Sequence, residues 1–177
     1  MQLALARILS EFPYLCSPLE VIDKALEAAD MSHDDLFVDL GCGDGTVLLR
    51  AAERFRVFSV GFEINPTLVK VARRRAHLAG LNDLIEIIHS DLFTADLSRF
   101  NVIYVYPSPL VIERLSRKIM YECVEGTRVL IHDYPLRNIE PDEVIRISGG
   151  PLHTHSIYVY RIKDAGEMLD NSRSFIA

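Results

Sequence analysis

A largely apolar run of five residues, Leu36–Leu40, passes directly into a loop with three glycines, Asp39-Leu40-Gly41-Cys42-Gly43-Asp44-Gly45-Thr46. A short apolar run is typical of a buried strand in a parallel sheet. The glycines let the backbone turn sharply, and the next residues, Thr46–Phe55, are predicted to form a helix. A strand that turns at once into a helix begins a βαβ unit, so this region predicts an α/β fold.

Strands and helices are predicted to alternate along the rest of the chain. The expected strands are residues 57–62, 84–89, 102–106 and 127–132, and the expected helices are residues 18–30, 66–79 and 110–121. Two further apolar runs, 144–147 and 156–162, flank Gly149-Gly150-Pro151, a connection so short that it predicts antiparallel neighbours. The whole order predicts a Rossmann-like, doubly wound, mostly parallel seven-stranded sheet with an antiparallel last strand.

Two of the expected helices carry start signals. Ser17, Pro18 and Glu20 fit a capping box, with Ser17 as the N-cap and Pro18 at the first helical position. Asn65 is predicted to cap the helix at 66–79. The run Arg73-Arg74-Arg75 on that helix is interpreted as a solvated face.

Length and charge limit the class of protein. The 177 residues fit one domain at residues 1–163, which leaves a polar tail at 164–177. A formal net charge of −6 argues against nucleic acid as a partner. Three cysteines without a CxxC pair indicate a reducing compartment, and the apolar opening 1–9 is too short to cross a bilayer. We therefore expect a cytoplasmic protein that is not embedded in a membrane.

The glycine-rich loop is a candidate cofactor site, because ligands of open α/β sheets bind outside the carboxyl ends of the strands. Gly41 and Gly43 allow the backbone to approach a ligand closely. Asp39 and Asp44 would repel a pyrophosphate but suit an ammonium group. Thr46 stands where a dinucleotide fingerprint has its third glycine. The loop therefore favours S-adenosylmethionine, which carries an ammonium, over a dinucleotide.

Two acids at the ends of the next strands extend this site. Glu63 follows the loop by about 20 residues, where a carboxylate can accept both ribose hydroxyls, although it could also be a helix-capping acid. Asp91 could accept from the adenine amino group while Leu92 packs on the ring. An Asx-turn is the alternative for Asp91.

The loop, the segment Phe62-Glu63-Ile64-Asn65 and the turn Ser90-Asp91-Leu92-Phe93 together resemble motifs of the class I S-adenosylmethionine-dependent methyltransferases. The resemblance covers about residues 14 to 162. It implies that Ile64 and Asn65 lie beside Glu63 in the cofactor site and that S-adenosyl-L-homocysteine is the product. In that class, the last strand is inserted into the sheet.

The chain is also similar to the archaeal protein-lysine methyltransferases and their mitochondrial relatives. The matching segments are Tyr14-Leu15-Cys16-Ser17-Pro18, which resembles their Tyr-x-x-(Ser/Thr)-Pro element, and the closing His155-Ser156-Ile157-Tyr158-Val159-Tyr160. The resemblance implies that Tyr14 and the segment 1–16 cover the cofactor, whereas core packing is the alternative for Tyr14. The family's short Pro-Ser or Leu-Thr segment corresponds here to Tyr104-Val105-Tyr106-Pro107-Ser108-Pro109.

Methyl transfer from a sulfonium is an in-line displacement, so the protein must mainly position a neutral nucleophile. Tyr106 and Ser108 are candidate catalytic residues that could orient a lysine amine, although Tyr106 could be an ordinary strand residue. His132 and His155 could reach the substrate side, but we interpret them as structural. His153 and His155 lack a third ligand at zinc spacing, so no metal is expected.

These features predict an N-methyltransferase that acts on exposed lysines of protein substrates. An RNA or DNA base N-methyltransferase is the main alternative, but that group commonly has (Asn/Asp)-Pro-Pro-(Tyr/Phe) where this chain has Tyr106-Pro107-Ser108-Pro109. A small-molecule methyltransferase would usually need additional lid segments. A module that binds the cofactor without catalysis is disfavoured by the intact Asp39, Glu63 and Asp91.

Overall fold

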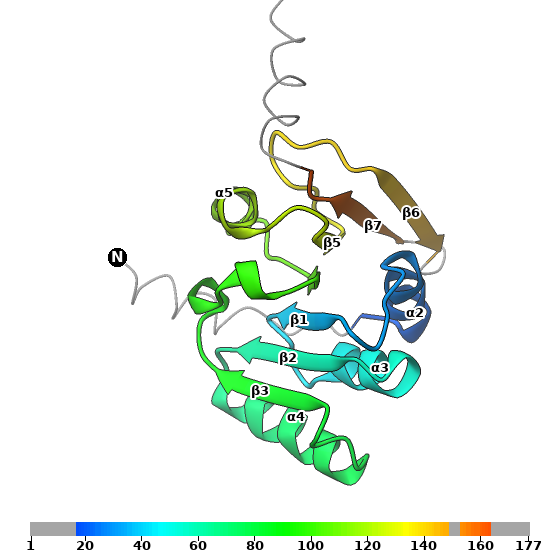
Figure 1. Ribbon diagram of the computed structural model, residues 1–177, viewed down its shortest axis with the longest axis vertical. Coiled ribbons are helices and arrows are strands. Elements are labelled where there is room, and N and C mark those ends of the chain that lie inside the picture. The colour runs from blue at the N-terminus through cyan, green and yellow to red at the C-terminus, as the bar shows by residue number, and fades with distance from the viewer. Residues whose placement is uncertain (1–16, 149–152, 164–177) are drawn as a thin grey trace, which may run out of the picture.

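A seven-stranded sheet forms the centre of the computed structural model, which describes residues 17–148 and 153–163 (Figure 1). The strands are β1 (Leu36–Leu40), β2 (Phe58–Glu63), β3 (Ile85–His89), β4 (Val102–Val105), β5 (Arg128–His132), β6 (Glu143–Ser148) and β7 (Thr154–Arg161). Their order is β3-β2-β1-β4-β5-β7-β6. The first five strands are parallel, and β7 is antiparallel to both of its neighbours. The predicted fold class is confirmed.

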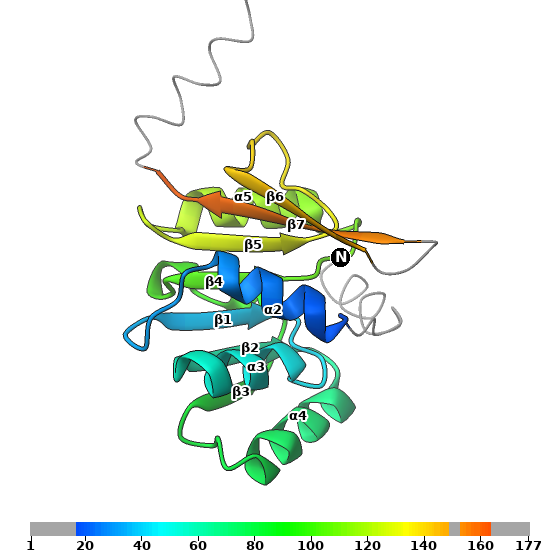
Figure 2. The same cartoon turned by 90° about the vertical axis from the view of Figure 1, so that its right-hand side faces the viewer.

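Helices cover both faces of the sheet. They are α2 (Leu19–Ala28), α3 (Thr46–Phe55), α4 (Pro66–Leu78) and α5 (Ile112–Glu122), with two short 3₁₀ turns, η1 (Leu92–Thr94) and η2 (Leu97–Arg99). Figures 1 and 2 show α2 and α3 on one face and α5 on the other. The residues of α4 belong to the same apolar cluster as those of α2 and α3. No helix in the described part of the chain has the length and apolarity that a bilayer crossing requires.

The alternation of side chains along β1 explains why the sheet needs both helical layers. Phe37 faces the cluster beneath α2, α3 and α4, whereas Val38 and Leu40 face the cluster beneath α5. All three side chains are buried. Full burial of such a side chain stabilises the fold by roughly 1.5–3 kcal/mol, so a strand with apolar residues on both faces is stable only between two layers.

Of the two predicted helix N-caps, one is confirmed and one is wrong. Asn65 caps α4 as predicted, since its Oδ1 accepts from the Thr67 N–H at 2.9 Å. The capping box at Ser17 is wrong: α2 begins at Leu19 with Pro18 as its N-cap, and no side chain caps it. Ser17 Oγ instead lies 3.1 Å from Nδ1 of His132 at the end of β5, so a tertiary contact takes the place of the local cap.

The arrangement of the C-terminal strands decides which residues lie together at the site. β6 and β7 are antiparallel, as the short connection predicted, and β7 lies between β5 and β6. His132 at the end of β5 pairs with Ile157 of β7. The start of β7 therefore lies at the same edge of the sheet as the carboxyl ends of β1, β2, β4 and β5.

Candidate active site

The backbone of the glycine-rich loop between β1 and α3 leaves space for a ligand to approach. Gly41 has a φ of 92°, and a Cβ added there would meet no atom within 4 Å. Its N–H donates to the Phe62 carbonyl at 2.8 Å, which ties the loop to β2. Gly45 has a φ of 80° and packs on Ala72 of α4, where an added Cβ would lie 3.1 Å from the Ala72 Cβ. Glycine is thus required by backbone conformation at both positions.

Three carboxylates surround this loop. Asp39 is 2% exposed, and its burial, followed by the charges of Glu63 and Asp44, raises its pKa well above the usual value. Glu63 accepts from the Gly43 N–H at 2.9 Å and from the Asn65 N–H at 2.7 Å, one bond on each oxygen. Because a carboxylate has about four acceptor sites, Glu63 retains the capacity for ligand hydroxyls. A cluster of this charge suits a cationic ligand.

Asp44 is held by protein groups on both of its oxygens. Oδ1 accepts from the N–H and the hydroxyl of Thr46, and Oδ2 forms an ion pair with Arg75 of α4. Arg73 also bonds to the protein, donating to the Ile87 carbonyl at 2.7 Å. The interpretation of the arginine run as a solvated face agrees with the exposed Arg73 and Arg74, whereas Arg75 is half-buried and pairs with Asp44 because α4 packs close to the loop.

The other residues predicted for the cofactor lie at the neighbouring strand ends. Asn65 caps α4, and the Ile64 carbonyl lies 3.1 Å from Nε2 of His89. Asp91 forms the Asx-turn that was the alternative, since its Oδ1 accepts from the Phe93 N–H at 3.0 Å, and half-buried Leu92 begins η1. Tyr14 lies outside the described residues. Contact of these residues with the cofactor remains a prediction.

Two cavities meet at Tyr106, the residue that follows β4. A narrow pocket lies against the glycine-rich loop and is lined by Ser17, Ile22, Asp39, Gly41, Cys42, Thr46, Val47, Tyr104 and Tyr106. A cleft of about 500 Å³ lies on the other side and is lined by Tyr106, Asp133, Tyr134, His153, Thr154, His155 and Ser156. Ser108 lines neither of them, and its Oγ accepts from the Leu110 N–H. Tyr106 thus separates a loop side from a cleft side.

Asp133 organises the cleft side. Its Oδ2 accepts from the Tyr106 hydroxyl at 2.9 Å, and its Oδ1 accepts from the Ser156 N–H at 2.9 Å. Burial by itself raises its pKa, but the Ser156 N–H and then His132 outweigh burial and hold the pKa below its usual value. Asp133 has a φ of 61°, an uncommon conformation for a residue other than glycine. Sequence reasoning missed Asp133, although its position just after a parallel strand was a usable signal.

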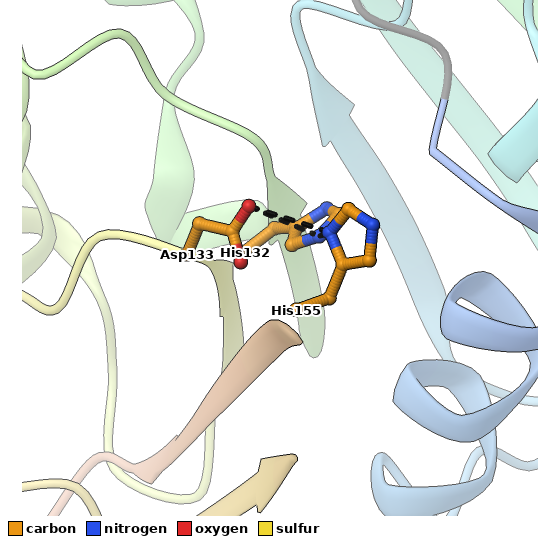
Figure 3. Close-up of side chains that lie close together, drawn as sticks. All are labelled: His132, Asp133 and His155. Carbon is orange, nitrogen blue, oxygen red and sulfur yellow. Dashed lines mark hydrogen bonds and ion pairs between the residues drawn. The ribbon is translucent and has the colours of Figure 1, made fainter. Parts of the chain in front are cut away.

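A group of rings fills the space behind Asp133. His132 is fully buried, and Tyr106 stacks on it with ring centroids 3.9 Å apart. Nδ1 of His132 lies 3.1 Å from the Tyr104 hydroxyl, and Nε2 lies 2.9 Å from Nδ1 of His155. Figure 3 shows His132, Asp133 and His155 converging on one point. Burial lowers the pKa of His132 to about 4, so its imidazole is neutral at pH 7.

Comparison with known proteins links this geometry to one enzyme class. A family model described as the ANTKMT methyltransferase domain matches residues 39–143. The protein-lysine N-methyltransferase of Saccharolobus islandicus is 35% identical over 151 residues, which are 85% of this chain and 93% of the archaeal protein. The adenine nucleotide translocase lysine N-methyltransferase of Mus musculus is 33% identical over 76% of this chain, which spans only 58% of the mouse protein.

A solved structure is similar over nearly its whole length. The crystal structure of an RNA methyltransferase from Salinibacter ruber in complex with S-adenosyl-L-homocysteine has a TM-score of 0.79 and 36% identity. The similarity covers 85% of this chain and 95% of the bacterial one. Its bound product contains the amino-acid and nucleoside groups for which the sequence predicted the glycine-rich loop, Asp39 and Glu63.

Proposed function

Since this chain belongs to the family of the ANTKMT methyltransferase domain and is a methyltransferase that uses S-adenosylmethionine, we propose that it methylates lysine side chains of proteins. The archaeal protein-lysine N-methyltransferase supports this acceptor, because the similarity extends over 93% of that protein. In the molecule itself, the proposal depends on one observation: Tyr106 lines both the pocket at the glycine-rich loop and the cleft beyond it.

On the loop side, the chain offers the groups that would hold the cofactor. Asp39 supplies a buried carboxyl group that can accept from the ammonium, Gly41 leaves space beside the backbone, and Glu63 has acceptor sites for ribose hydroxyls. When bound, S-adenosylmethionine supplies the methyl group, as a new N–C bond forms and the sulfonium S–C bond breaks. The acidic loop suits the positive charge of this molecule.

On the cleft side, Asp133 and Tyr106 support a lysine as acceptor. Lysine arrives as an ammonium, and the pKa of Asp133 is held low, so its carboxylate is negative at neutral pH and attracts that charge. Keeping the amine neutral at pH 7 costs about 4 to 5 kcal/mol. The Asp133 carboxylate adds to this cost because it favours the ammonium, whereas desolvation and the nearby sulfonium charge of the bound cofactor reduce it. The released proton leaves through the open cleft to water. The Tyr106 hydroxyl, already bonded to Asp133, orients the nitrogen lone pair.

RNA is the second candidate acceptor, because the Salinibacter protein is described as an RNA methyltransferase. Two features of this chain favour lysine instead. The residue before Pro107 is Tyr106, which has neither the amide nor the carboxylate that commonly accepts from an exocyclic base amine. The formal net charge of −6 also gives no general attraction to a phosphate backbone.

The decisive experiment is transfer of label from methyl-tritiated S-adenosylmethionine to an extract of cells that lack this protein. We expect labelled bands that survive nuclease and disappear with protease, and acid hydrolysis should release methylated lysine. The Asp133→Asn variant should bind S-adenosyl-L-homocysteine normally but label these bands far more slowly. Label confined to nuclease-sensitive material would exclude the lysine acceptor and establish the RNA alternative.

A further inference from the structure

We propose that His132, Asp133 and His155 form a binding site for a divalent transition-metal ion, with Zn²⁺ as the ion of best fit. This site lies where β5 and β7 run side by side (Figure 3), and two of its residues, Asp133 and His155, line the cleft. Three different donor atoms converge there: Nε2 of His132, Oδ2 of Asp133 and Nδ1 of His155.

The separations of these donors match those of ligands on one tetrahedral ion. Zn–N and Zn–O bonds of about 2.0–2.2 Å at tetrahedral angles place the ligand atoms roughly 3.3–3.5 Å apart. Here Nε2 of His132 lies 2.9 Å from Nδ1 of His155 and 3.6 Å from Oδ2 of Asp133, and the third separation is 3.4 Å. Movements of a few tenths of an ångström would bring all three donors to bonding distance.

The groups around the donors hold them in the state that a metal requires. Nδ1 of His132 lies 3.1 Å from the Tyr104 hydroxyl and 3.1 Å from Ser17 Oγ, so the ring can keep its proton on Nδ1 and present a lone pair at Nε2. Oδ1 of Asp133 accepts from the Ser156 N–H, and Oδ2, which also accepts from the Tyr106 hydroxyl, lies 3.6 Å and 3.4 Å from the nitrogens of the two imidazoles. Supporting contacts of this kind orient the ligands of protein metal sites.

A fourth ligand is available at the mouth of the site. Nε2 of His153 lies 3.4 Å from Oδ2 of Asp133, and its side chain is 55% exposed, so it could join the ion or leave the position to water. Two or three imidazoles with one carboxylate suit Zn²⁺ and Cu²⁺ better than Mg²⁺ or Ca²⁺, which prefer oxygen ligands. Sequence spacing did not predict this site, because the third ligand comes from another strand.

Metal binding has a consequence that rests on the proposed function. An ion bound to Oδ2 of Asp133 would neutralise the carboxylate that attracts the lysine ammonium. The positive charge of the ion would also repel that ammonium. Zn²⁺ should therefore inhibit transfer by competing with the protein substrate, while S-adenosyl-L-homocysteine still binds at the loop.

The test of the site itself uses the full-length, chelator-treated protein and Co²⁺ alone as a spectroscopic probe. We expect one equivalent to bind with the intense visible absorption of a tetrahedral ion and to be displaced by one equivalent of Zn²⁺. His155→Gln and Asp133→Asn should weaken binding by more than the roughly 10–100-fold that loss of a supporting contact costs a metal site. His33→Gln, an exposed histidine beside Asp34, is the matched control and should bind like the wild type.

The wild-type titration decides the proposal even where a variant does not fold. Absence of stoichiometric Co²⁺ binding by the wild type would overturn it, as would unchanged binding in a folded His155→Gln protein. Binding of S-adenosyl-L-homocysteine and labelling of proteins in metal-free buffer are measured separately. If the protein binds no metal, both cofactor binding and protein labelling stay as expected. If the proposed function is wrong, only the labelling of proteins is lost.

Discussion

Glu63 at the end of β2 braces the loop by accepting from the Gly43 and Asn65 N–H groups, and we predict that it also binds the ribose of the cofactor. We expect Glu63→Ala to weaken binding of S-adenosyl-L-homocysteine by roughly 2 to 4 kcal/mol, because charged hydrogen bonds are lost in a partly desolvated site. Isothermal titration calorimetry measures this loss. Glu53→Ala, an exposed acid of α3, is the control, and an unchanged dissociation constant in folded Glu63→Ala would remove Glu63 from the site.

Tyr106 is the second residue whose role can be isolated. Tyr106→Phe removes the hydroxyl that donates to Asp133 but keeps the ring that stacks on His132. Loss of one such hydrogen bond, about 1 to 1.5 kcal/mol, should lower kcat about tenfold and leave the affinity for S-adenosyl-L-homocysteine nearly unchanged. Single-turnover rates and calorimetry separate the two effects. Tyr121→Phe on the exposed face of α5 should change neither, and an equal rate in Tyr106→Phe would contradict the positioning role.

At the scale of elements, the close approach of β2 to α3 depends on Gly61. A Cβ at this position would lie 2.5 Å from Leu48 Cδ1 and 2.6 Å from Cys42 Sγ. Gly61→Ala should therefore lower the free energy of unfolding by about 1 to 3 kcal/mol, the usual cost of overpacking. Urea denaturation measures it.

A double-mutant cycle identifies the cause of this loss. In a Leu48→Ala background, the nearest opposing atom is gone, so Gly61→Ala should cost less than it does in the wild type. Equal costs in both backgrounds would show that steric contact between β2 and α3 is not the reason.

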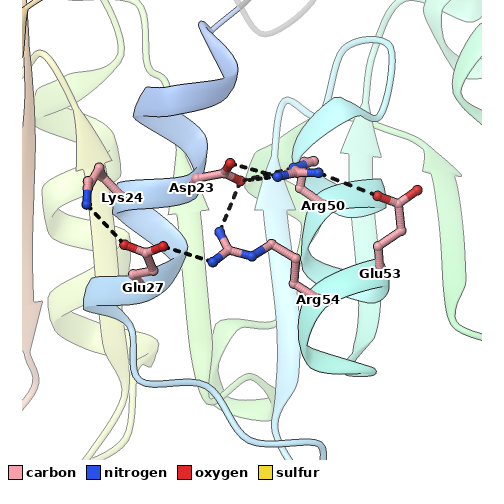
Figure 4. Close-up of polar contacts among 6 residues, drawn as sticks. All are labelled: Asp23, Lys24, Glu27, Arg50, Glu53 and Arg54. Carbon is pink, nitrogen blue, oxygen red and sulfur yellow. Dashed lines mark hydrogen bonds and ion pairs between the residues drawn. The ribbon is translucent and has the colours of Figure 1, made fainter.

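At the scale of the whole molecule, an ion-pair network between α2 and α3 makes the free energy of unfolding depend on pH. Asp23 accepts from Arg50 and Arg54, and Glu27 pairs with Arg54 and Lys24 (Figure 4). The hydrogen bond from Arg50 is the main cause that lowers the pKa of Asp23 below its usual value, although burial opposes it. A lowered pKa in the folded state means that this contribution is fully present above about pH 4 and is lost as the pH falls through the lowered value.

Asp23→Asn tests that contribution. We expect it to lower the free energy of unfolding at pH 7 by about 1 kcal/mol or less, because the pair is partly exposed and screened by solvent. The difference from the wild type should shrink below about pH 4. Urea denaturation at pH 7, 5 and 3 provides the comparison, with Asp34→Asn as an exposed control. A difference that stays constant down to pH 3 would assign the loss to something other than the carboxylate charge.

Local signals in the sequence determined the sheet and its helices, and they indicated where the cofactor is expected. The apolar run of β1, the glycines after it and the cap at Asn65 each act over a few neighbouring residues, and all were predicted. Ser17 shows the limit of such signals, since it does not cap α2 and its Oγ instead lies 3.1 Å from Nδ1 of His132.

Only the tertiary structure decided the cleft. His132 ends β5, Asp133 directly follows it, and His155 lies near the start of β7, and they meet because β7 is inserted between β5 and β6. Likewise, Asp44 is held by Arg75, 31 residues further along the chain. Strand order and helix packing are set by burial summed over the whole sheet rather than by any local pattern. The sequence alone therefore determined where a methyl donor is expected, whereas folding created the place where the acceptor is expected.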